Sequence, residues 1–424
     1  MRILLLSQFH APVIGGEERH VSALGESLAA RGHEVTVATQ RHPSRAEIHR
    51  EAGVTVRSLR GTMQRGAGLF SDDERRHAPP FPDPELTLNL ARIVHATQPH
   101  VVHAHNWLLH SYLPIRPFTR AAFVVTLHDY GFVCARKTLM RGPEPCPGPS
   151  PRRCLPCASA HYGTTVGCVT YAGNALFSRL EARSTDRFIA VSRAVAEKCG
   201  LPKGKTPYDI LPTFIPDAVG DLDPKPDPRV AALPANGYLL YVGDLNRNKG
   251  VEVLLRAYAA LSDAPPLVMI GRRCADMPET LPPNVTVFES WPHAAVMHAW
   301  SRCLFGIAPS VWPEACGTIV MEAHAVGRPM IASDIGGLSD LVDPGRTGLL
   351  VRANDAVALS RAMETLIRDP VLRERMAGAS RARAELFMAK TIVPRIERIY
   401  ETVAPGPSPD PKQALSPVGT WRQP

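Results

Sequence analysis

The chain has 424 residues, of which 45% are apolar and 21% are charged. This length predicts two or three domains that each bury a core, and it excludes a small scaffold stapled by disulfides. No apolar run approaches the roughly 18 to 20 residues that span a bilayer, which argues against an integral membrane protein. The apolar stretch after Met1 is interrupted at Ser7, before a secretory core of about 7 to 15 residues develops, so we expect a cytoplasmic protein.

The excess of positive charge is confined to the first half of the chain. Residues 1–200 hold 24 Lys and Arg against 16 Asp and Glu, whereas residues 201–424 hold 24 of each. A basic half attracts an anionic partner, such as a phospholipid surface, a lipid phosphate or nucleic acid. A general preference for arginine, with 40 Arg against 8 Lys, is the alternative explanation. We expect no nucleic-acid partner, because no dense basic run is interleaved with aromatic residues.

The first 200 residues alternate short apolar strands with helices. We predict a strand from Arg2 to Ser7, then a glycine loop, then a helix that carries its apolar residues on one face and ends at Gly32. The apolar residues of this helix are Val21, Leu24 and Leu28, and further strands are predicted at residues 34–39, 54–59, 101–105, 123–127 and 188–191. This alternation indicates a parallel sheet that is covered by helices on both faces.

The same pattern restarts after a proline-rich segment. A strand is predicted at residues 238–242, a helix at about 251–261 and a strand at 267–270. The fold class is therefore α/β, with two doubly wound, Rossmann-like domains. The predicted boundaries are an N-terminal domain at 1–215, a linker at 216–236, a C-terminal domain at 237–385, a closing helix at 386–402 and a disordered proline-rich tail at 403–424.

The stretch from Leu304 to Val342 carries the strongest chemical signal. A buried strand at 304–308 is followed by a loop, and Gly317 and Thr318 open a helix. The free N–H groups and the positive dipole end of such a helix suit a diphosphate, and Gly317 lets a phosphate approach the backbone. Glu322 can accept hydrogen bonds from a ribose diol, while Glu314 lies in the loop, toward a transferred group. The alternative is a helix glutamate that complements the dipole and a solvated loop glutamate.

Basic residues are expected at the corresponding edge of the neighbouring strand. The strand that ends at Gly243 leads to Arg247 and Lys249 before the next helix, and Gly15 and Gly16 follow the first strand of the chain. Open parallel sheets bind ligands at the carboxyl ends of their strands. Two such domains are expected to enclose a ligand between them.

These residues resemble the family 4 retaining glycosyltransferases of the GT-B fold. The resemblance covers about residues 1–402. Its motifs are Glu314 and Glu322 around Pro309 to Gly317, Gly327-Arg328-Pro329, Gly336-Gly337, Tyr241-Val242-Gly243 with Lys249-Gly250, Gly15-Gly16-Glu17-Glu18, Thr126-Leu127-His128-Asp129 and Val191-Ser192.

The resemblance implies transfer of a sugar from a nucleotide-sugar donor with retention of anomeric configuration and without a catalytic cofactor or divalent metal. By motif position, Lys249 would hold the diphosphate, Glu322 the ribose and Glu314 the donor sugar. The other expected donor contacts are Gly15, Gly16, Arg247, Gly317 and Thr318. His128 would lie near the reacting centre, so His128 and Glu314 are the candidate catalytic residues. The leaving diphosphate oxygen would take the acceptor proton, and no dedicated base is expected.

Three positions depart from the family pattern. Asp244 stands where an arginine is usual, Ala315 replaces a glycine, and Thr213 replaces an asparagine. Arg247 or Arg272 is expected to supply the missing charge. Two other functions stay open: a sugar-nucleotide hydrolase, epimerase or disaccharide phosphorylase on the same fold, and a non-catalytic regulator that binds nucleotide or nucleic acid.

Four of the nine cysteines lie close together in a segment at 130–160 that we expect to be a loop. They are Cys134, Cys146, Cys154 and Cys157. Four thiolates can bind a structural zinc. A segment that has no hydrophobic core of its own needs such a bound ion to stabilise it. Free or redox-paired thiols are the alternative, because the spacing lacks a second CxxC pair.

The acceptor is expected to be a glycan or a lipid-linked precursor. The cysteine-rich segment also carries Arg136, Lys137, Arg141, Arg152 and Arg153. Together with the basic first half, these residues favour an anionic acceptor and a peripheral position on the inner face of the membrane. Alternatively, the basic residues only solvate a proline-rich loop, and the acceptor is a small soluble molecule.

Overall fold

The structure is a computed structural model that describes residues 1–11, 13, 15–42, 44–65 and 78–404. The chain divides into two compact units. The N-terminal unit comprises Met1–Thr138, Gly148–Pro212 and the residues from Ile392 onward, and the C-terminal unit comprises Leu139–Pro147 and Thr213–Thr391. The predicted tail at 403–424 lies almost wholly outside the described residues.

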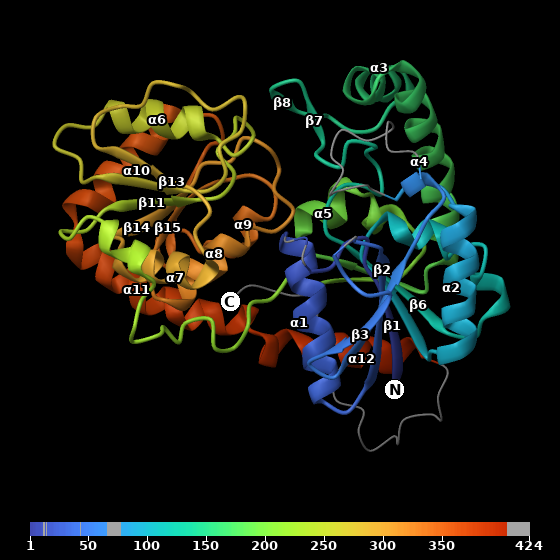
Figure 1. The fold of residues 1–424 in the computed structure, drawn as a ribbon. Coiled ribbons are helices and arrows are strands. Elements are labelled where there is room, and N and C mark those ends of the chain that lie inside the picture. Colours follow the sequence, from blue (N-terminus) through green and yellow to red (C-terminus); the bar gives the residue numbers. More distant parts are fainter. Residues whose placement is uncertain (12, 14, 43, 66–77, 405–424) are drawn as a thin grey trace. The chain divides into compact units, whose positions relative to one another are not determined.

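The N-terminal unit is built on an eight-stranded sheet with the order β10-β9-β6-β5-β1-β2-β4-β3 (Figure 1). Its strands are β1 (Arg2–Leu6), β2 (Glu34–Gln40), β3 (Ile48–Glu51), β4 (Val54–Leu59), β5 (Val101–Ala104), β6 (Ala122–Leu127), β9 (Arg187–Ala190) and β10 (Tyr208–Ile210). All neighbours are parallel except β3 and β4. The six predicted strands are present, whereas β3 and β10 were missed because neither is a buried apolar run.

The helices of this unit are α1 (Gly16–Ala30), α2 (Pro84–Thr97), α3 (Pro151–Tyr162), α4 (Thr164–Ser184), α5 (Arg193–Lys198) and α12 (Ala389–Val403). Helix α1 buries Val21, Leu24 and Leu28, as the spacing predicts, and the chain turns at Gly32 with a φ of +89°. Helix α2 begins at Pro84, and the Asp83 side chain accepts hydrogen bonds from the first-turn N–H groups.

The cysteine-rich segment at 130–160 is not simply a loop. Helix α3 contains Cys154 and Cys157, and the two short strands β7 (Met140–Arg141) and β8 (Glu144–Pro145) precede it. Helix α3 packs on α4, and Gly167 permits the contact, because a Cβ there would lie 2.5 Å from the Ala158 carbonyl oxygen. The expectation of a loop is therefore wrong for the second half of the segment, since its helix depends on packing against α4.

Helix α12 corresponds to the predicted closing helix and begins three residues later, after a 3₁₀ turn at Glu385–Phe387. Its buried residues include Ile392, Ile396 and Ile399. Glu397 on this helix lies 2.6 Å from Arg31 Nη2 and 2.7 Å from His33 Nε2. The last helix thus packs on the N-terminal unit.

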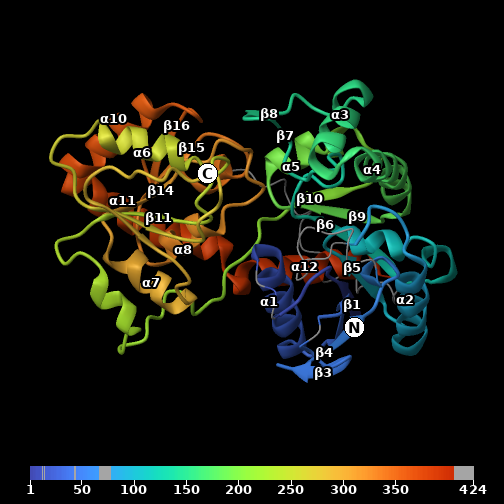
Figure 2. The same ribbon diagram turned by 45° about the horizontal axis from the view of Figure 1, so that its top comes forward.

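The C-terminal unit has a wholly parallel six-stranded sheet with the order β13-β12-β11-β14-β15-β16 (Figures 1 and 2). Its strands are β11 (Leu239–Val242), β12 (Leu267–Ile270), β13 (Val285–Phe288), β14 (Phe305–Ala308), β15 (Met330–Ser333) and β16 (Gly348–Val351). Its helices are α6 (Val251–Ala259), α7 (His293–Arg302), α8 (Thr318–Ala325), α9 (Leu338–Leu341), α10 (Ala356–Arg368) and α11 (Pro370–Ala384).

Both faces of the C-terminal sheet are buried. Successive strand residues point to opposite faces, so Leu239 and Tyr241 belong to one core cluster while Leu240 belongs to the other. The proline-rich segment at 216–236, which we expected to be a linker, is part of this unit. Its residues Val219, Val230 and Leu233 are buried in the core.

No helix in the described part of the chain is both long enough and apolar enough to cross a membrane.

Candidate functional site

The carboxyl edge of the C-terminal sheet brings two loops together. Strands β11 and β14 are parallel neighbours, so the loops that follow them lie at the same edge. The loops are joined by a 2.9 Å hydrogen bond from Val311 N to Asn248 O. Gly250 has a φ of +78°, and a Cβ there would lie 1.9 Å from the Pro309 carbonyl oxygen. A glycine is therefore required where the two loops meet.

Two of the predicted site residues, Glu314 and Lys249, form an ion pair at this edge. Lys249 Nζ lies 2.8 Å from Glu314 Oε1, and Ser310 Oγ donates to the same oxygen. Lys249 Nζ also lies 5.5 Å from the centre of the Trp312 ring. Burial alone would raise the pKa of Glu314, but the Lys249 charge and the hydrogen bonds from Lys249 and Ser310 hold this pKa below its ordinary value. The buried carboxylate is thus kept ionised.

The backbone of Glu314 is fixed by the glycine pair that follows β15. Gly337 N donates a 2.6 Å hydrogen bond to the Glu314 carbonyl oxygen. Gly336 has a φ of +63°, and a Cβ there would lie 2.3 Å from that oxygen. The Gly336-Gly337 motif therefore holds the acidic loop in place.

Helix α8 begins at Thr318, directly after Gly317, as the sequence predicts. Glu322 lies in the second turn of the helix and is buried, and its Oε1 is 2.8 Å from His293 Nε2 at the start of α7. A Cβ on Gly317 would lie 2.6 Å from a Leu338 methyl group, so a side chain would crowd the helix start. The two predicted carboxylates therefore both flank the start of α8, and each has a basic partner.

Arg247 does not join the Lys249 and Glu314 pair. Its guanidinium lies 3.1 Å from Glu252 Oε1, and more than half of its side chain is exposed. Arg272 Nη2 lies 3.0 Å from Asp244 Oδ2, at the position where an arginine is usual in the family. Arg272 therefore lies beside Asp244, the residue that departs from the family pattern. Arg247 instead pairs with Glu252 on the surface of α6.

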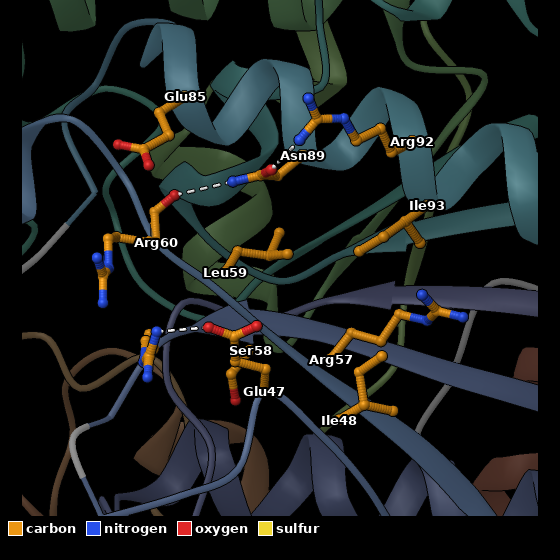
Figure 3. Close-up of a pocket in the computed structure, with 11 residues that line it drawn as sticks. Glu47, Ile48, Arg57, Ser58, Leu59, Arg60, Glu85, Asn89, Arg92 and Ile93 are labelled. Atoms are coloured by element: carbon orange, nitrogen blue, oxygen red, sulfur yellow. Dashed lines mark hydrogen bonds and ion pairs between the residues drawn. The ribbon is translucent and has the colours of Figure 1, made fainter.

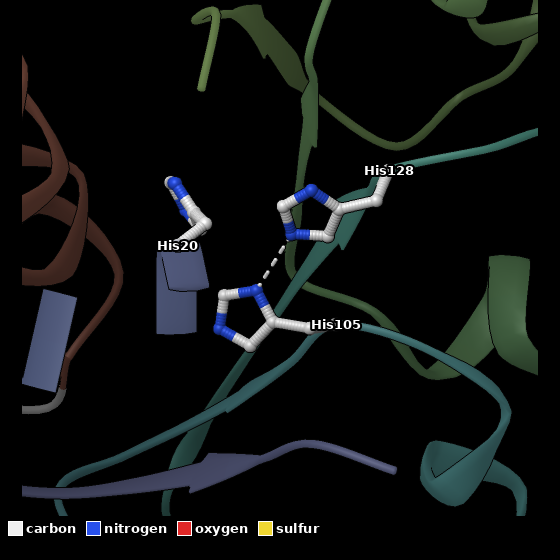
Figure 4. Close-up of side chains that lie close together, drawn as sticks. All are labelled: His20, His105 and His128. Carbon is white, nitrogen blue, oxygen red and sulfur yellow. Dashed lines mark hydrogen bonds between the residues drawn. The ribbon is translucent and has the colours of Figure 1, made fainter. Parts of the chain in front are cut away.

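The corresponding edge of the N-terminal sheet holds a cluster of histidines. His128 follows β6, His105 follows β5 and His20 lies on α1, whose first residue is Gly16 (Figure 4). His105 Nδ1 lies 2.9 Å from His128 Nε2. Burial lowers the pKa of His128 and of His105 well below the ordinary histidine value, and the neighbouring histidines add to the effect. These rings are neutral at pH 7.

Gly15 and Gly16 lie at the start of α1, as predicted. Gly15 is extended, with a φ of −153°, and precedes the first helical residue. A Cβ on Gly16 would meet no atom within 4 Å. Gly16 therefore borders open space.

The four predicted zinc ligands are not gathered into a metal site. None of them is in a disulfide. Cys154 Sγ accepts a hydrogen bond from Ser150 N, and Cys157 Sγ lies 3.6 Å from an Arg136 nitrogen. Within the described ranges, the one group of three metal-ligating side chains is His20, His105 and His128. The structure thus gives no support to a four-cysteine zinc site.

A pocket of about 450 Å³ lies between β4 and α2 of the N-terminal unit (Figure 3). Four arginines line it, together with Glu47 and Glu85: Arg41, Arg57, Arg60 and Arg92. Arg41 pairs with Glu47, and Arg92 donates to Asn89. Arg57 Nε is buried and has no hydrogen-bond partner among the described residues. None of the predicted site residues lines this pocket.

The sequence reasoning missed several partners of the predicted residues. Ser310 and Trp312 belong to the recognised motif, yet nothing in their spacing shows that they contact Glu314 or Lys249. His293 is 29 residues from Glu322, and His20 is 85 residues from His105. These contacts depend on the order of strands and helices in space, which no local signal gives.

Two family models match the chain. Residues 14–215 match the model described as Glycosyltransferase Family 4, and residues 229–383 match the model described as Glycosyl transferases group 1. The chain belongs to glycosyltransferase family 4. This finding confirms the family resemblance that the motifs indicated, and the protein is a glycosyltransferase.

The chain is similar to several named proteins. A glycogen synthase of Mycobacterium tuberculosis is 27% identical over 431 residues, which cover 94% of each chain. A phosphatidyl-myo-inositol mannosyltransferase of Mycobacterium leprae is 30% identical over 42% of this chain and 50% of its own. Anabaena HepE, solved with UDP-glucose, superposes with a TM-score of 0.66 over 95% of this chain and 100% of its own, at 18% identity. The predicted GT-B fold is confirmed.

Proposed function

We propose that this glycosyltransferase moves a sugar from a nucleoside diphosphate sugar to an acceptor with retention of anomeric configuration. The buried, ionised Glu314 carries the proposal, because it is paired with Lys249 at 2.8 Å beside the start of α8. A helix start and a lysine together attract a diphosphate, while the carboxylate suits the hydroxyl groups of a sugar. Glu322 in the same helix would accept hydrogen bonds from the ribose.

The reaction that fits these groups exchanges two bonds on one face of the sugar. The bond from the anomeric carbon to the diphosphate oxygen breaks, and a bond to the acceptor oxygen forms on the same face. The acceptor proton passes to the leaving phosphate oxygen. Lys249 and the N–H groups at the start of α8, including that of Thr318, would stabilise the charge that develops on the diphosphate. His128 in the N-terminal unit would hydrogen-bond the reacting sugar or acceptor.

The donor proposed for the first experiments is a UDP-sugar. HepE, which shares the fold, was solved with UDP-glucose, and the 27% identical relative is a glycogen synthase. We therefore propose UDP-glucose as the first donor to try. GDP-mannose is the second, because the 30% identical relative is a mannosyltransferase.

The acceptor proposed is anionic and lipid-borne. The pocket with four lining arginines supports an anionic group, since its two glutamates leave an excess of positive charge. Helix α4 supports a lipid surface, because it exposes an apolar stripe next to Arg179 and Arg183. The exposed apolar residues of α4 are Val166, Val169, Leu176 and Leu180.

The donor proposal is tested by measuring nucleotide binding and sugar transfer separately. Thermal shift with UDP, GDP and ADP should show stabilisation by one of them, and Glu322→Gln should weaken that stabilisation. The matched control is Glu364→Gln, which changes an exposed glutamate of α10 that pairs with Arg368. The proposal would be overturned if both variants bind nucleotide as the wild type does, or if the product has inverted configuration. Donor turnover without any acceptor would indicate a hydrolase instead.

The lipid proposal is tested by sedimentation with anionic and neutral vesicles at low and high salt. Each basic residue near an anionic surface contributes about 1 kcal/mol, so binding should fall as salt rises. Leu176→Ser/Leu180→Ser should abolish sedimentation. The matched control, Val357→Ser/Val371→Ser, changes two exposed valines of the C-terminal unit and should leave it intact. No binding to anionic vesicles at low salt contradicts the lipid-surface proposal and leaves the transferase assignment standing.

A further inference from the structure

Three histidine side chains converge at the carboxyl edge of the N-terminal sheet. His20 comes from α1, His105 from the end of β5 and His128 from the end of β6 (Figure 4). One ring nitrogen of each lies within 4.8 Å of the other two. The ring centres are 4.9 Å apart for His20 and His128, and 5.2 Å apart for His105 and His128. Three distant parts of the chain thus supply one compact set of imidazoles.

Hydrogen bonds leave this cluster incompletely satisfied. His105 and His128 share one hydrogen bond of 2.9 Å. The other nitrogen of His105, Nε2, is buried and has no hydrogen-bond partner among the described residues. Among the described residues, the Nδ1 contact with His128 is therefore the one hydrogen bond of the His105 ring, and Nδ1 is the nitrogen that faces the other two histidines. His103, by contrast, has both nitrogens bonded, to Tyr400 and Thr126, each at 2.7 Å.

We propose that His20, His105 and His128 bind a divalent transition-metal ion, with Zn²⁺ as the favoured ion. Neutral imidazole nitrogen is a preferred zinc ligand, and three protein ligands leave a fourth position for water. Bonds of about 2.0 to 2.1 Å in tetrahedral geometry separate the ligand nitrogens by about 3.3 Å. The observed nitrogen positions, 2.9 Å apart for one pair and within 4.8 Å for all, bracket that value.

Asp129 can offset part of the charge of the ion, whereas burial holds the pKa of Glu17 well above its ordinary value. Glu17 lies one turn before His20 on α1 and accepts a hydrogen bond from Asn106, the residue after His105. Asp129 directly follows His128 in the chain. A divalent cation held by neutral ligands needs a negative group close by, since an uncompensated buried charge is costly. The four cysteines are not members of this cluster.

Metal binding would inhibit the transferase. A zinc-bound His128 no longer offers its ligating nitrogen to a sugar or an acceptor. This consequence depends on the function proposed above for His128, whereas the binding of the metal does not. The prediction is a reversible inhibition by Zn²⁺ that a chelator relieves.

The test begins with zinc binding to the full chain, measured without substrates. The wild-type protein, stripped with a chelator and dialysed, should bind about one Zn²⁺ at this site by calorimetry and metal analysis. His20→Ala should weaken binding at least about 100-fold, because even the partners behind zinc ligands are worth about 10 to 100-fold. The matched control is His95→Ala, which removes an exposed histidine of α2. His20→Gln serves in place of His20→Ala if circular dichroism shows that the latter does not fold.

Cobalt distinguishes this site from a cysteine site. Co²⁺ bound by imidazoles gives weak visible bands, while thiolate ligands add an intense charge-transfer band in the near ultraviolet. We expect the weak bands alone, unchanged in Cys154→Ser/Cys157→Ser and lost in His20→Ala. A thiolate band, or zinc binding that folded His20→Ala keeps in full, would overturn the proposal.

An activity assay separates this inference from the proposed function. Zn²⁺ should inhibit the wild type and the His95→Ala control, and should inhibit His20→Ala only at concentrations about 100-fold higher. Zinc that binds at the histidines without inhibiting transfer supports the metal site and contradicts the role of His128. Failure of zinc to bind contradicts the metal site and leaves the transferase proposal untouched.

Discussion

The carboxyl edges of the two sheets carry different kinds of side chain. At the C-terminal sheet, Lys249 pairs with Glu314 and His293 pairs with Glu322, so the edge is charged. At the N-terminal sheet, His20, His105 and His128 form a cluster of neutral rings, because burial lowers their pKa values. The two units thus share one sheet architecture and differ in the side chains at the ends of their strands.

This contrast suggests a division of labour. Charged groups suit a diphosphate, whose negative charge increases as the sugar leaves. Neutral imidazoles suit hydroxyl groups, which need hydrogen-bond partners that can both donate and accept. The predictions below test whether the charge of one edge and the neutrality of the other are each required.

Removal of the positive charge from the C-terminal edge should have the largest effect. Lys249→Met is expected to lower sugar transfer by about 10² to 10³, the usual loss when one group that stabilises the transition state is deleted. The variant also leaves the buried Glu314 carboxylate without its ion-pair partner, which destabilises the unit. Steady-state kinetics and thermal unfolding measure the two effects.

A double variant separates stability from catalysis. Lys249→Met/Glu314→Gln removes both charges, so thermal stability should largely return while transfer stays low. Recovery of both would mean that Lys249 serves only the fold, and the charged edge would then have no part in donor binding.

The charged edge could be predicted from sequence because its signals are local. An apolar strand, a loop that carries Glu314 and a glycine before Thr318 lie within fifteen residues of one another. The predicted start of α8 is confirmed for that reason. The residues that complete the edge, such as Ser310 and His293, were not predicted, since their contacts depend on packing.

The neutral edge could not be predicted in the same way. His20, His105 and His128 meet because β1, β5 and β6 are consecutive neighbours in the sheet, and strand order is not encoded in a local pattern. The prediction of a loop in the cysteine-rich segment was wrong for a related reason. Its helix α3 is stabilised by packing on α4, so composition alone indicated a loop.

Acid should weaken the neutral edge before it weakens the charged one. Burial lowers the pKa of His20 from its ordinary 6.5 to about 4, so the folded state disfavours the charged ring. The stability that His20 contributes is complete above pH 6.5 and falls as the pH drops from 6.5 to 4, by up to about 3 kcal/mol. The pKa of Glu314 is lowered, so its contribution is lost only below the ordinary glutamate value of 4.5.

Thermal unfolding of His20→Gln between pH 7 and 4, with a chelator present, checks this order. The variant should lose part of the dependence on pH that the wild type shows between 6.5 and 4. Identical pH profiles would mean that folding does not lower the pKa of His20.

The two carboxylates of the charged edge should differ in what they control. Glu322→Gln is expected to weaken nucleotide binding, and Glu314→Gln to lower turnover, each by about ten- to a hundredfold, the loss of one charge-assisted hydrogen bond. Nucleotide titrations and kcat values with saturating donor separate the effects. Equal and negligible changes in both variants would contradict the donor site.

The glycines of the two edges should respond differently to replacement by alanine, and the smallest effect is expected at Gly16. Gly250→Ala should destabilise the C-terminal unit by about 1 to 3 kcal/mol or more, since its φ of +78° is unfavourable for alanine and its Cβ would meet the Pro309 carbonyl oxygen at 1.9 Å. Gly16→Ala should leave stability almost unchanged, because a Cβ there meets nothing within 4 Å. If the open space beside Gly16 is occupied by a substrate, the alanine raises KM without a change in unfolding temperature. A lower unfolding temperature with an unchanged KM would instead give Gly16 a role in the fold alone.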